Sequence, residues 1–177
     1  MHGQTDRIYL RTPEERDLDQ ILALWTNPAV TRHIGGPREP RVVLDHFGQL
    51  TRDPEAFAQE QAERWWSIVE LRSGELVGLC HLLEKEVEGQ TEVEVGYFLL
   101  PAYWGQGYAT EAASLVVAYA FCELQLESVV AVIDPGNNAS ISVASRLGMQ
   151  LEQQVLRSDG VARRVYRLRR KDRPVTL

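Results

Sequence analysis

A glycine-rich segment between a strand pattern and a helix pattern is the part of the chain best suited to bind an anion. Residues 104–110 read Trp-Gly-Gln-Gly-Tyr-Ala-Thr, and apolar residues at helical spacing follow from Ala112 to Tyr119. The first backbone N–H groups of a helix lack intrahelical partners and carry the positive end of its dipole. Two glycines would let a phosphate approach them closely. The spacing therefore predicts a site for a phosphorylated cofactor.

Two common nucleotide-binding motifs do not fit this segment. A dinucleotide-binding turn would follow its strand directly, whereas Pro101, Ala102 and Tyr103 intervene here. A phosphate loop of the Walker type needs a Gly-Lys-Ser/Thr sequence, which the segment lacks. The Gly-x-Gly-x-x-Thr match is weak by itself, so an ordinary helix-entry turn is the alternative for this stretch.

Two carboxylates precede the glycine segment on a predicted strand. Side chains alternate along residues 92–100, so Glu92 and Glu94 share one face with Phe98. A carboxylate at Glu94 could accept a proton from an attacking nucleophile, with Glu92 as the second choice. The alternative for Glu94 is a polar residue on a half-solvated face or an ion-pair partner.

Together these motifs resemble the acetyl-CoA motif of the GNAT N-acetyltransferases. The matching residues are Glu94-Val95-Gly96-Tyr97 and the stretch from Trp104 to Ala112. A second block, Asn138-Ala139-Ser140 followed by Arg146-Leu147-Gly148-Met149, resembles the next element of that family. The resemblance is closest to the branch that includes the acetyltransferases of ribosomal-protein N-termini. That branch also contains enzymes that act on other amines.

The resemblance implies a mixed α/β fold with a mostly antiparallel central sheet, a splayed parallel strand pair at the acetyl-CoA site and flanking helices. It implies direct transfer of an acetyl group from acetyl-CoA to a primary amine, on a protein N-terminus or a small molecule. A domain that binds CoA without turnover is the alternative. The residues expected to contact the cofactor are Phe98, Leu99, Leu100, Gly105, Gln106, Gly107, Tyr108, Ala109, Thr110 and Asn138.

An amine that attacks a thioester needs a polarised carbonyl oxygen and a stabilised thiolate. We expect the oxygen to accept hydrogen bonds from backbone N–H groups near Leu99 and Leu100. Many relatives have a tyrosine acid where this chain has Ala144, so that acid is missing. The resemblance instead places Ser140 beside the sulfur; its alternative role is to cap the first turn of a helix.

Composition indicates one globular domain over residues 1–177. The chain is 44% hydrophobic and 25% charged, with a formal net charge of -6. Residues 163–177 hold seven of the 19 basic side chains and one acid, but apolar residues alternate with them as in a final strand. We therefore expect no nucleic-acid partner. The acidic remainder suits an amine-bearing substrate.

Targeting and metal signals are absent from the sequence. No stretch reaches the roughly 20 apolar residues of a membrane span, and no signal peptide is apparent, so we expect a cytoplasmic protein with no membrane partner. Cys80 and Cys122 lie in apolar segments, which predicts reduced, buried thiols. The four histidines lack metal-ligand spacing, so we expect no metal site. Monomer and homodimer both stay open.

The remaining pattern predicts the order of the elements. We expect early helices to cover the substrate side, with the first of them capped at Asp17 and the last helix capped at Asn138. The predicted strands are residues 7–11, 66–71, 76–83, 91–100, 129–133, 150–157 and 161–169. The predicted helices are residues 17–25, about 44–50, 54–64, about 108–124 and 138–148, with a loop at 31–40.

Overall fold

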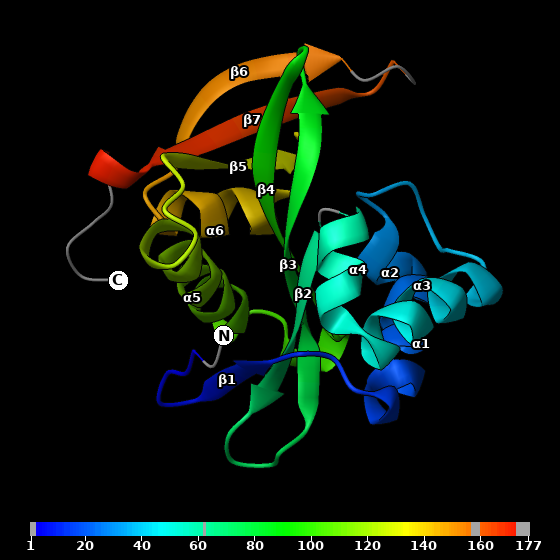
Figure 1. The fold of residues 1–177 in the computed structure, drawn as a ribbon. Coiled ribbons are helices and arrows are strands. Elements are labelled where there is room, and N and C mark those ends of the chain that lie inside the picture. Colours follow the sequence, from blue (N-terminus) through cyan, green and yellow to red (C-terminus); the bar gives the residue numbers. More distant parts are fainter. Residues whose placement is uncertain (1–2, 62, 157–159, 173–177) are drawn as a thin grey trace.

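A computed structural model describes residues 3–61, 63–156 and 160–172 and shows a mixed α/β fold built on one seven-stranded sheet (Figure 1). The strand order is β1-β2-β3-β4-β5-β7-β6. Adjacent strands are antiparallel except β4 and β5, which are parallel. The predicted fold class is therefore confirmed, and its one parallel pair lies inside the sheet.

The elements follow the predicted order, with some changes in their bounds. The strands are β1 (Ile8–Arg11), β2 (Glu63–Glu70), β3 (Leu76–Val87), β4 (Gln90–Leu99), β5 (Ser128–Ile133), β6 (Gln150–Leu156) and β7 (Ala162–Arg169). The helices are α1 (Leu18–Thr26), α2 (Pro28–Thr31), α3 (Pro40–Arg52), α4 (Pro54–Gln61), α5 (Tyr108–Cys122) and α6 (Asn138–Arg146). Short 3-10 turns occupy Glu15–Asp17, Pro101–Tyr103 and Arg170–Asp172.

Helices cover both faces of the sheet (Figure 1). On one face α5 and α6 pack on a core that includes Val95, Leu99 and Val129. On the other face α1, α3 and α4 pack on Trp65 and Leu79. That they cover the substrate side stays a prediction. Each face of the sheet thus has its own layer of helices and its own buried core.

The parallel strands β4 and β5 separate soon after they meet. Their pairing consists of Glu94 opposite Val130. The Leu100 N–H donates to the Val77 oxygen of β3 at 3.0 Å. Because N–H groups alternate in direction along a strand, the N–H of Leu99 faces β5, where the two strands have diverged. The predicted splayed pair is confirmed, and it leaves strand N–H groups facing the opening.

The first helix begins differently from the prediction. Asp17 ends a 3-10 turn that Glu14 caps, and its side chain makes no cap for α1. The buried Asp17 carboxylate accepts hydrogen bonds from Arg11 at 2.6 and 2.8 Å, from Ser67 Oγ at 2.8 Å and from the Glu14 N–H at 2.9 Å. A buried charge requires such partners. Asp17 therefore ties β1 and β2 to the start of α1.

Removal of the Asp17 charge should destabilise the fold. Burial acts to raise the pKa of Asp17, but hydrogen bonds from Arg11, the Glu14 N–H and Ser67 outweigh it and hold the pKa below its ordinary value. The resulting stability is present above a pH of about 4 and is lost as pH falls through the lowered pKa. Asp17→Asn should lower the free energy of unfolding at neutral pH by about 3 kcal/mol, because it leaves Arg11 with only the more distant and more exposed Glu14, at 3.6 Å, as an acidic partner.

Urea unfolding at neutral and acidic pH measures this effect. The difference between the Asp17→Asn variant and the parent should shrink as the pH falls below about 4, because the parent also loses the charge as the pH passes through the lowered pKa of Asp17. Asp19→Asn on the exposed face of α1 is the control, with an expected loss of at most about 1 kcal/mol. A variant as stable as the parent at neutral pH would contradict the assigned role of Asp17.

Several other predictions need correction. Pro28 ends α1 as expected but opens α2 at once, because Asn27 accepts the Ala29 N–H at 2.9 Å. The helix predicted to reach Arg64 ends at Gln61, and β2 follows. Cys122 is exposed, whereas Cys80 is fully buried and burial raises the pKa of its thiol. The strand end predicted at residue 157 lies outside the described residues.

The described residues contain neither a candidate membrane-spanning helix nor a candidate metal-binding group. Among their helices, none combines the length and apolar character that a membrane crossing requires. The same part of the chain holds no group of three or more histidine, cysteine or acidic side chains arranged to bind a metal ion.

Candidate active site

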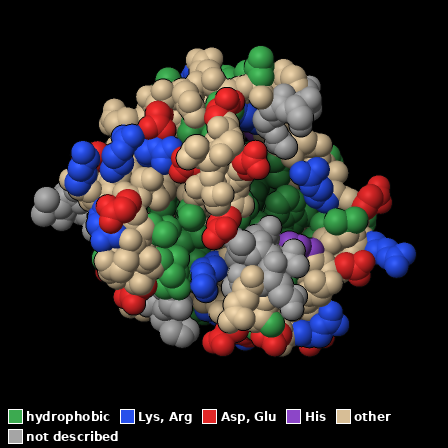
Figure 2. Space-filling view, turned by 45° about the horizontal axis from the view of Figure 1, so that its top comes forward, with side chains coloured by type: hydrophobic (Ala, Val, Ile, Leu, Met, Phe, Trp, Pro, Cys, Tyr) green, Lys and Arg blue, Asp and Glu red, His purple; other side chains and the backbone are tan. Residues whose placement is uncertain are grey.

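A cavity of about 780 Å³ opens at the divergence of β4 and β5. It reaches residues at the start of α5 and on α6 on one side of the sheet, and residues of α1, α2 and α3 on the other. Figure 2 shows hydrophobic side chains gathered in a hollow beside a histidine. Its size suits a small-molecule site.

The α5 end of the cavity has the features of an anion site. Gly105 and Gly107 have φ angles of +74° and +89°, a left-handed conformation that favours glycine. The N–H groups of Thr110 and Glu111 bond to the Gly107 oxygen. Within the described part of the chain, the N–H groups of Tyr108 and Ala109 donate to no backbone oxygen of the preceding turn. The predicted helix N-terminus is thus present, with its first two N–H groups available to a ligand.

Six of the residues expected to bind the cofactor line the cavity: Phe98, Leu99, Gly105, Gly107, Ala109 and Thr110. The Oγ1 of Thr110 is buried and has no hydrogen-bond partner among the described residues. This hydroxyl adds a polar group to the helix N-terminus. Contact between these six residues and the cofactor stays a prediction.

The other four expected residues are placed differently. The Leu100 N–H is bonded to Val77, so it is not free to polarise a carbonyl. The Gln106 side chain is exposed and donates to the Ala102 oxygen at 2.9 Å. The Tyr108 hydroxyl donates to Glu70, and its ring packs under Arg7 with the guanidinium carbon 4.7 Å from the ring centre. In these three cases the Leu100 N–H and the side chains of Gln106 and Tyr108 already have partners within the protein, whereas the Tyr108 N–H stays available. Contact with the cofactor stays a prediction.

Asn138 does not cap the last helix. The preceding Asp134-Pro135-Gly136 turn places Asn137 just before α6, and its Oδ1 accepts the Ser140 N–H at 3.1 Å. Asn137 lines the cavity, whereas Asn138 is exposed. The sequence predicted the cap but was wrong by one residue, because two adjacent asparagines have equal cap propensity.

Glu94 lines the cavity, and its carboxylate is already paired. Lys85 Nζ lies 2.7 Å from Glu94 Oε2, and the Val132 N–H donates to Oε1 at 3.3 Å. Glu92, the second candidate on this face, forms a two-point ion pair with Arg167 at 2.6 and 2.8 Å. Glu92 therefore links β4 to β7 through Arg167. Of the two carboxylates, Glu94 is the one that lines the cavity.

Ser140 lies in the first turn of α6 beside Tyr97, a residue of the predicted motif for which the sequence predicted no chemical role. The Tyr97 hydroxyl donates to the Ser140 carbonyl oxygen at 3.3 Å, and both residues line the cavity. Burial raises the pKa of Tyr97 to about 12, so its phenol stays protonated at neutral pH. Ala144, the position of the missing acid, is buried in α6.

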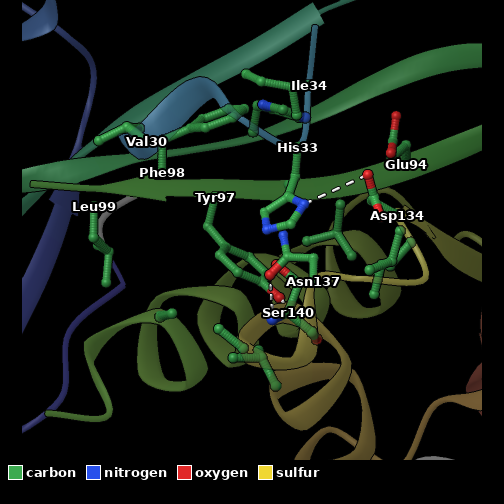
Figure 3. A pocket seen from close by; sticks show the side chains of 18 of the residues that line it. Val30, His33, Ile34, Glu94, Tyr97, Phe98, Leu99, Asp134, Asn137 and Ser140 are labelled. Carbon is green, nitrogen blue, oxygen red and sulfur yellow. Dashed lines mark hydrogen bonds and ion pairs between the residues drawn. The ribbon is translucent and has the colours of Figure 1, made fainter. Parts of the chain in front are cut away.

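A second missed feature is a contact across the cavity between His33 and Asp134 (Figure 3). His33 follows α2 and Asp134 follows β5, and the distance between His33 Nδ1 and Asp134 Oδ2 is 3.4 Å. Arg32 Nε donates to His33 Nε2 at 2.9 Å. The Gly136 N–H, followed by His33 and Arg163, holds the pKa of Asp134 below its usual range. No local pattern links residues so far apart in sequence.

Comparison with known proteins agrees with this fold and cavity. Residues 7–150 match the family described as "Acetyltransferase (GNAT) domain". The chain is 35% identical over 152 residues to YkkB of Bacillus subtilis, an uncharacterized protein, across 85% of this chain and 86% of that protein. It is 30% identical over 150 residues to the spermidine N(1)-acetyltransferase of Escherichia coli, across 84% of this chain and 76% of that protein.

A solved structure gives the same result for the fold. The acetyltransferase from Agrobacterium tumefaciens superimposes with a TM-score of 0.79 at 26% identity, covering 96% of this chain and 95% of that one. Fold and sequence together define an acyltransferase. The chain belongs to the GNAT acetyltransferase family, whose cosubstrate is acetyl-CoA.

Proposed function

We propose that this enzyme transfers the acetyl group of acetyl-CoA directly to a primary amine. One observation carries the proposal: a single cavity joins the helix N-terminus at α5 to the surface under α1–α3. A phosphorylated donor can therefore bind on one side of the sheet while an amine reaches it from the other. Holding both reactants in one cavity allows direct attack without an acyl-enzyme step.

The residues around the opening can assist each part of the transfer. As the amine nitrogen bonds to the thioester carbon, negative charge grows on the carbonyl oxygen, and the Leu99 N–H faces this opening to stabilise it. Glu94, directly or through a water, accepts the proton that the amine loses. The carbon–sulfur bond breaks, and the departing thiolate takes a proton from Tyr97, with the Ser140 hydroxyl as a second donor.

A thiol-release assay tests this function. Purified protein with acetyl-CoA should release free CoA when small amines, peptides, polyamines or aminoglycosides are added, and mass spectrometry should find the acetylated amine. Tight CoA binding without turnover on any amine would instead support a CoA-binding domain.

Loss of the Tyr97 hydroxyl should slow the reaction. Tyr97→Phe should lower kcat about tenfold to hundredfold, because Ser140 and water can replace the missing proton donor only in part. Ser140→Ala should have a smaller effect. Steady-state kinetics measure kcat of the two variants, and calorimetry measures their affinity for CoA. The affinity of both variants for CoA should hardly change.

Tyr119→Phe is the matched control for Tyr97→Phe. The ring of Tyr119 packs edge-on against Trp66, with centroids 5.5 Å apart, and Tyr119 does not line the cavity. This variant should keep the parent kcat. Equal rates for Tyr97→Phe and the parent would exclude a role for the phenol in proton transfer.

A further inference from the structure

The acceptor end of the cavity is apolar and aromatic, and its chemistry deepens the proposed function, on which this inference rests. Side chains from α1, α2, α3, β2 and β4, together with the loop after α2, form its wall: Trp25, Val30, Ile34, Phe47, Trp65 and Phe98. The ring centroids of Trp25 and Phe98 are 4.8 Å apart, and those of Phe47 and Trp65 are 5.1 Å apart. Trp25 also contacts Phe47 and Trp65, with centroids 6.1 and 6.0 Å apart, so the four rings form one aromatic cluster in this wall.

Part of this wall is open to a ligand. Trp25, Val30, Ile34 and Phe98 are only partly buried, so they expose apolar surface to the cavity. Phe47 and Trp65 are buried behind them and hold the wall in place. An apolar substrate body gains roughly fourfold in affinity for each CH₂ group that such a wall removes from water.

Carboxylates available to a cation are lacking among the side chains that the structure describes around the cavity. The acids that line it are Glu94 and Asp134. Glu94 pairs with Lys85, and Asp134 contacts both His33 and Arg163, at 3.4 and 3.7 Å. Both acids are therefore already balanced by neighbouring basic side chains.

Two further basic side chains line the same region. Arg32 and Arg38 flank Ile34 on the loop between α2 and α3, and both are exposed. The cavity thus carries local positive charge although the whole chain has a formal net charge of -6. A second ammonium group on the acceptor would meet repulsion here and find no unpaired carboxylate. Attraction to the aromatic faces offsets this only in part.

We propose that the acceptor is a primary amine on an apolar body that carries no second positive charge. Aliphatic or aromatic monoamines and peptides with a bulky apolar N-terminal residue share this chemistry. Polyamines, the class to which spermidine belongs, are excluded as preferred acceptors. The proposal thus separates this chain from the polyamine specificity in the name of its Escherichia coli relative.

Two amines with the same six-carbon chain provide the test of this acceptor preference. Hexylamine and 1,6-diaminohexane differ by one ammonium group, and kcat/KM for hexylamine should be higher by at least about tenfold. Phenethylamine and a leucyl dipeptide amide should also be acetylated, and their relative kcat/KM separates a small-molecule source from a peptide source. Equal or better use of 1,6-diaminohexane or spermidine would overturn this inference and leave the proposed function intact. Absence of turnover on every amine would overturn both.

A negative charge added at the edge of the cavity provides an independent test of the preference for a monoamine. Val42 on α3 lines the cavity and is 61% exposed, so substitution there should not disturb the fold. Val42→Glu should raise the ratio of kcat/KM for 1,6-diaminohexane to that for hexylamine about threefold to fivefold, the scale of an exposed ion pair. Val42→Gln, with the same length and no charge, should leave the ratio at its parent value. An unchanged ratio in Val42→Glu would contradict this placement of the acceptor.

Discussion

Replacement of Ala109 by glutamate should weaken CoA binding by about 10³-fold while the protein stays folded. Ala109 is in the first turn of α5 and lines the cavity where Gly105 and Gly107 leave room for a phosphate. A carboxylate in a first helical turn is itself favourable by about 0.3 to 1 kcal/mol, so the helix should not suffer. The new charge would occupy the anion site and repel the pyrophosphate. Like-charge contact of this kind costs about 4 kcal/mol.

Ala109→Gln separates charge from bulk in this experiment. It adds almost the same volume without the charge, so its loss of CoA affinity should be at most about tenfold. Gly107 is a less suitable position for the test. Its φ angle of +89° strains any other residue, and an added Cβ would lie 3.1 Å from Arg7 Nη2, where a glutamate could pair with the arginine.

Isothermal calorimetry with CoA measures both Ala109 variants, and circular dichroism confirms that they are folded. Equal affinities for the glutamate and glutamine variants would show that the pyrophosphate does not lie at the start of α5. The difference between them should narrow at high salt, because screening shortens the range of charge repulsion.

Local signals explain how much of the fold and site could be predicted from the sequence. The glycine segment, the alternation along β4 and the helix period of α5 each depend on residues close in the chain, and all three appear in the structure. These features also locate the cavity, because the strand–turn–helix connection places one end of the opening. The sequence therefore predicted the strand, the glycine turn and the helix start that border the cavity, and anion binding there stays a prediction.

Other parts of the cavity depend on contacts that have no local pattern. His33 meets Asp134, and Tyr97 meets Ser140, only after the sheet forms and α6 packs against it. The position of Asp17 also depends on distant residues. Hydrogen bonds from Arg11 and Ser67 stabilise the buried carboxylate, so Asp17 does not cap the helix as its residue type predicts. Such residues become visible only through tertiary structure.

Charge near the site also differs from the expectation based on composition. The acidic body of the chain suggested steering of a cationic substrate, yet the acids that line the cavity are paired and Arg32 and Arg38 stand at its acceptor side. The net charge of a protein acts over long range and affects how often a charged substrate reaches its surface. Specificity depends on the groups that lose water when the substrate binds. The same chain can therefore attract amines in general and still disfavour a second ammonium group.

Glu94→Gln should lower kcat by about 10² to 10⁴, the usual contribution of a positioned base. CoA affinity should hardly change, because Glu94 lies on β4 and the anion end of the cavity lies at the start of α5. The residual rate should rise toward high pH as free amine becomes available without the help of a base. Fixed-time assays of the acetylated product, with saturating acetyl-CoA, measure how the rate depends on pH.

Lys85→Gln distinguishes a base from an ion-pair partner. Both substitutions break the same contact, in which Lys85 Nζ and Glu94 Oε2 are 2.7 Å apart. If Glu94 serves only to pair with Lys85, the two variants should lose the same activity and keep the parent pH profile. If Glu94 is the base, Lys85→Gln retains the carboxylate that accepts the proton. Its kcat should then stay within about tenfold of the parent, far above the kcat of Glu94→Gln.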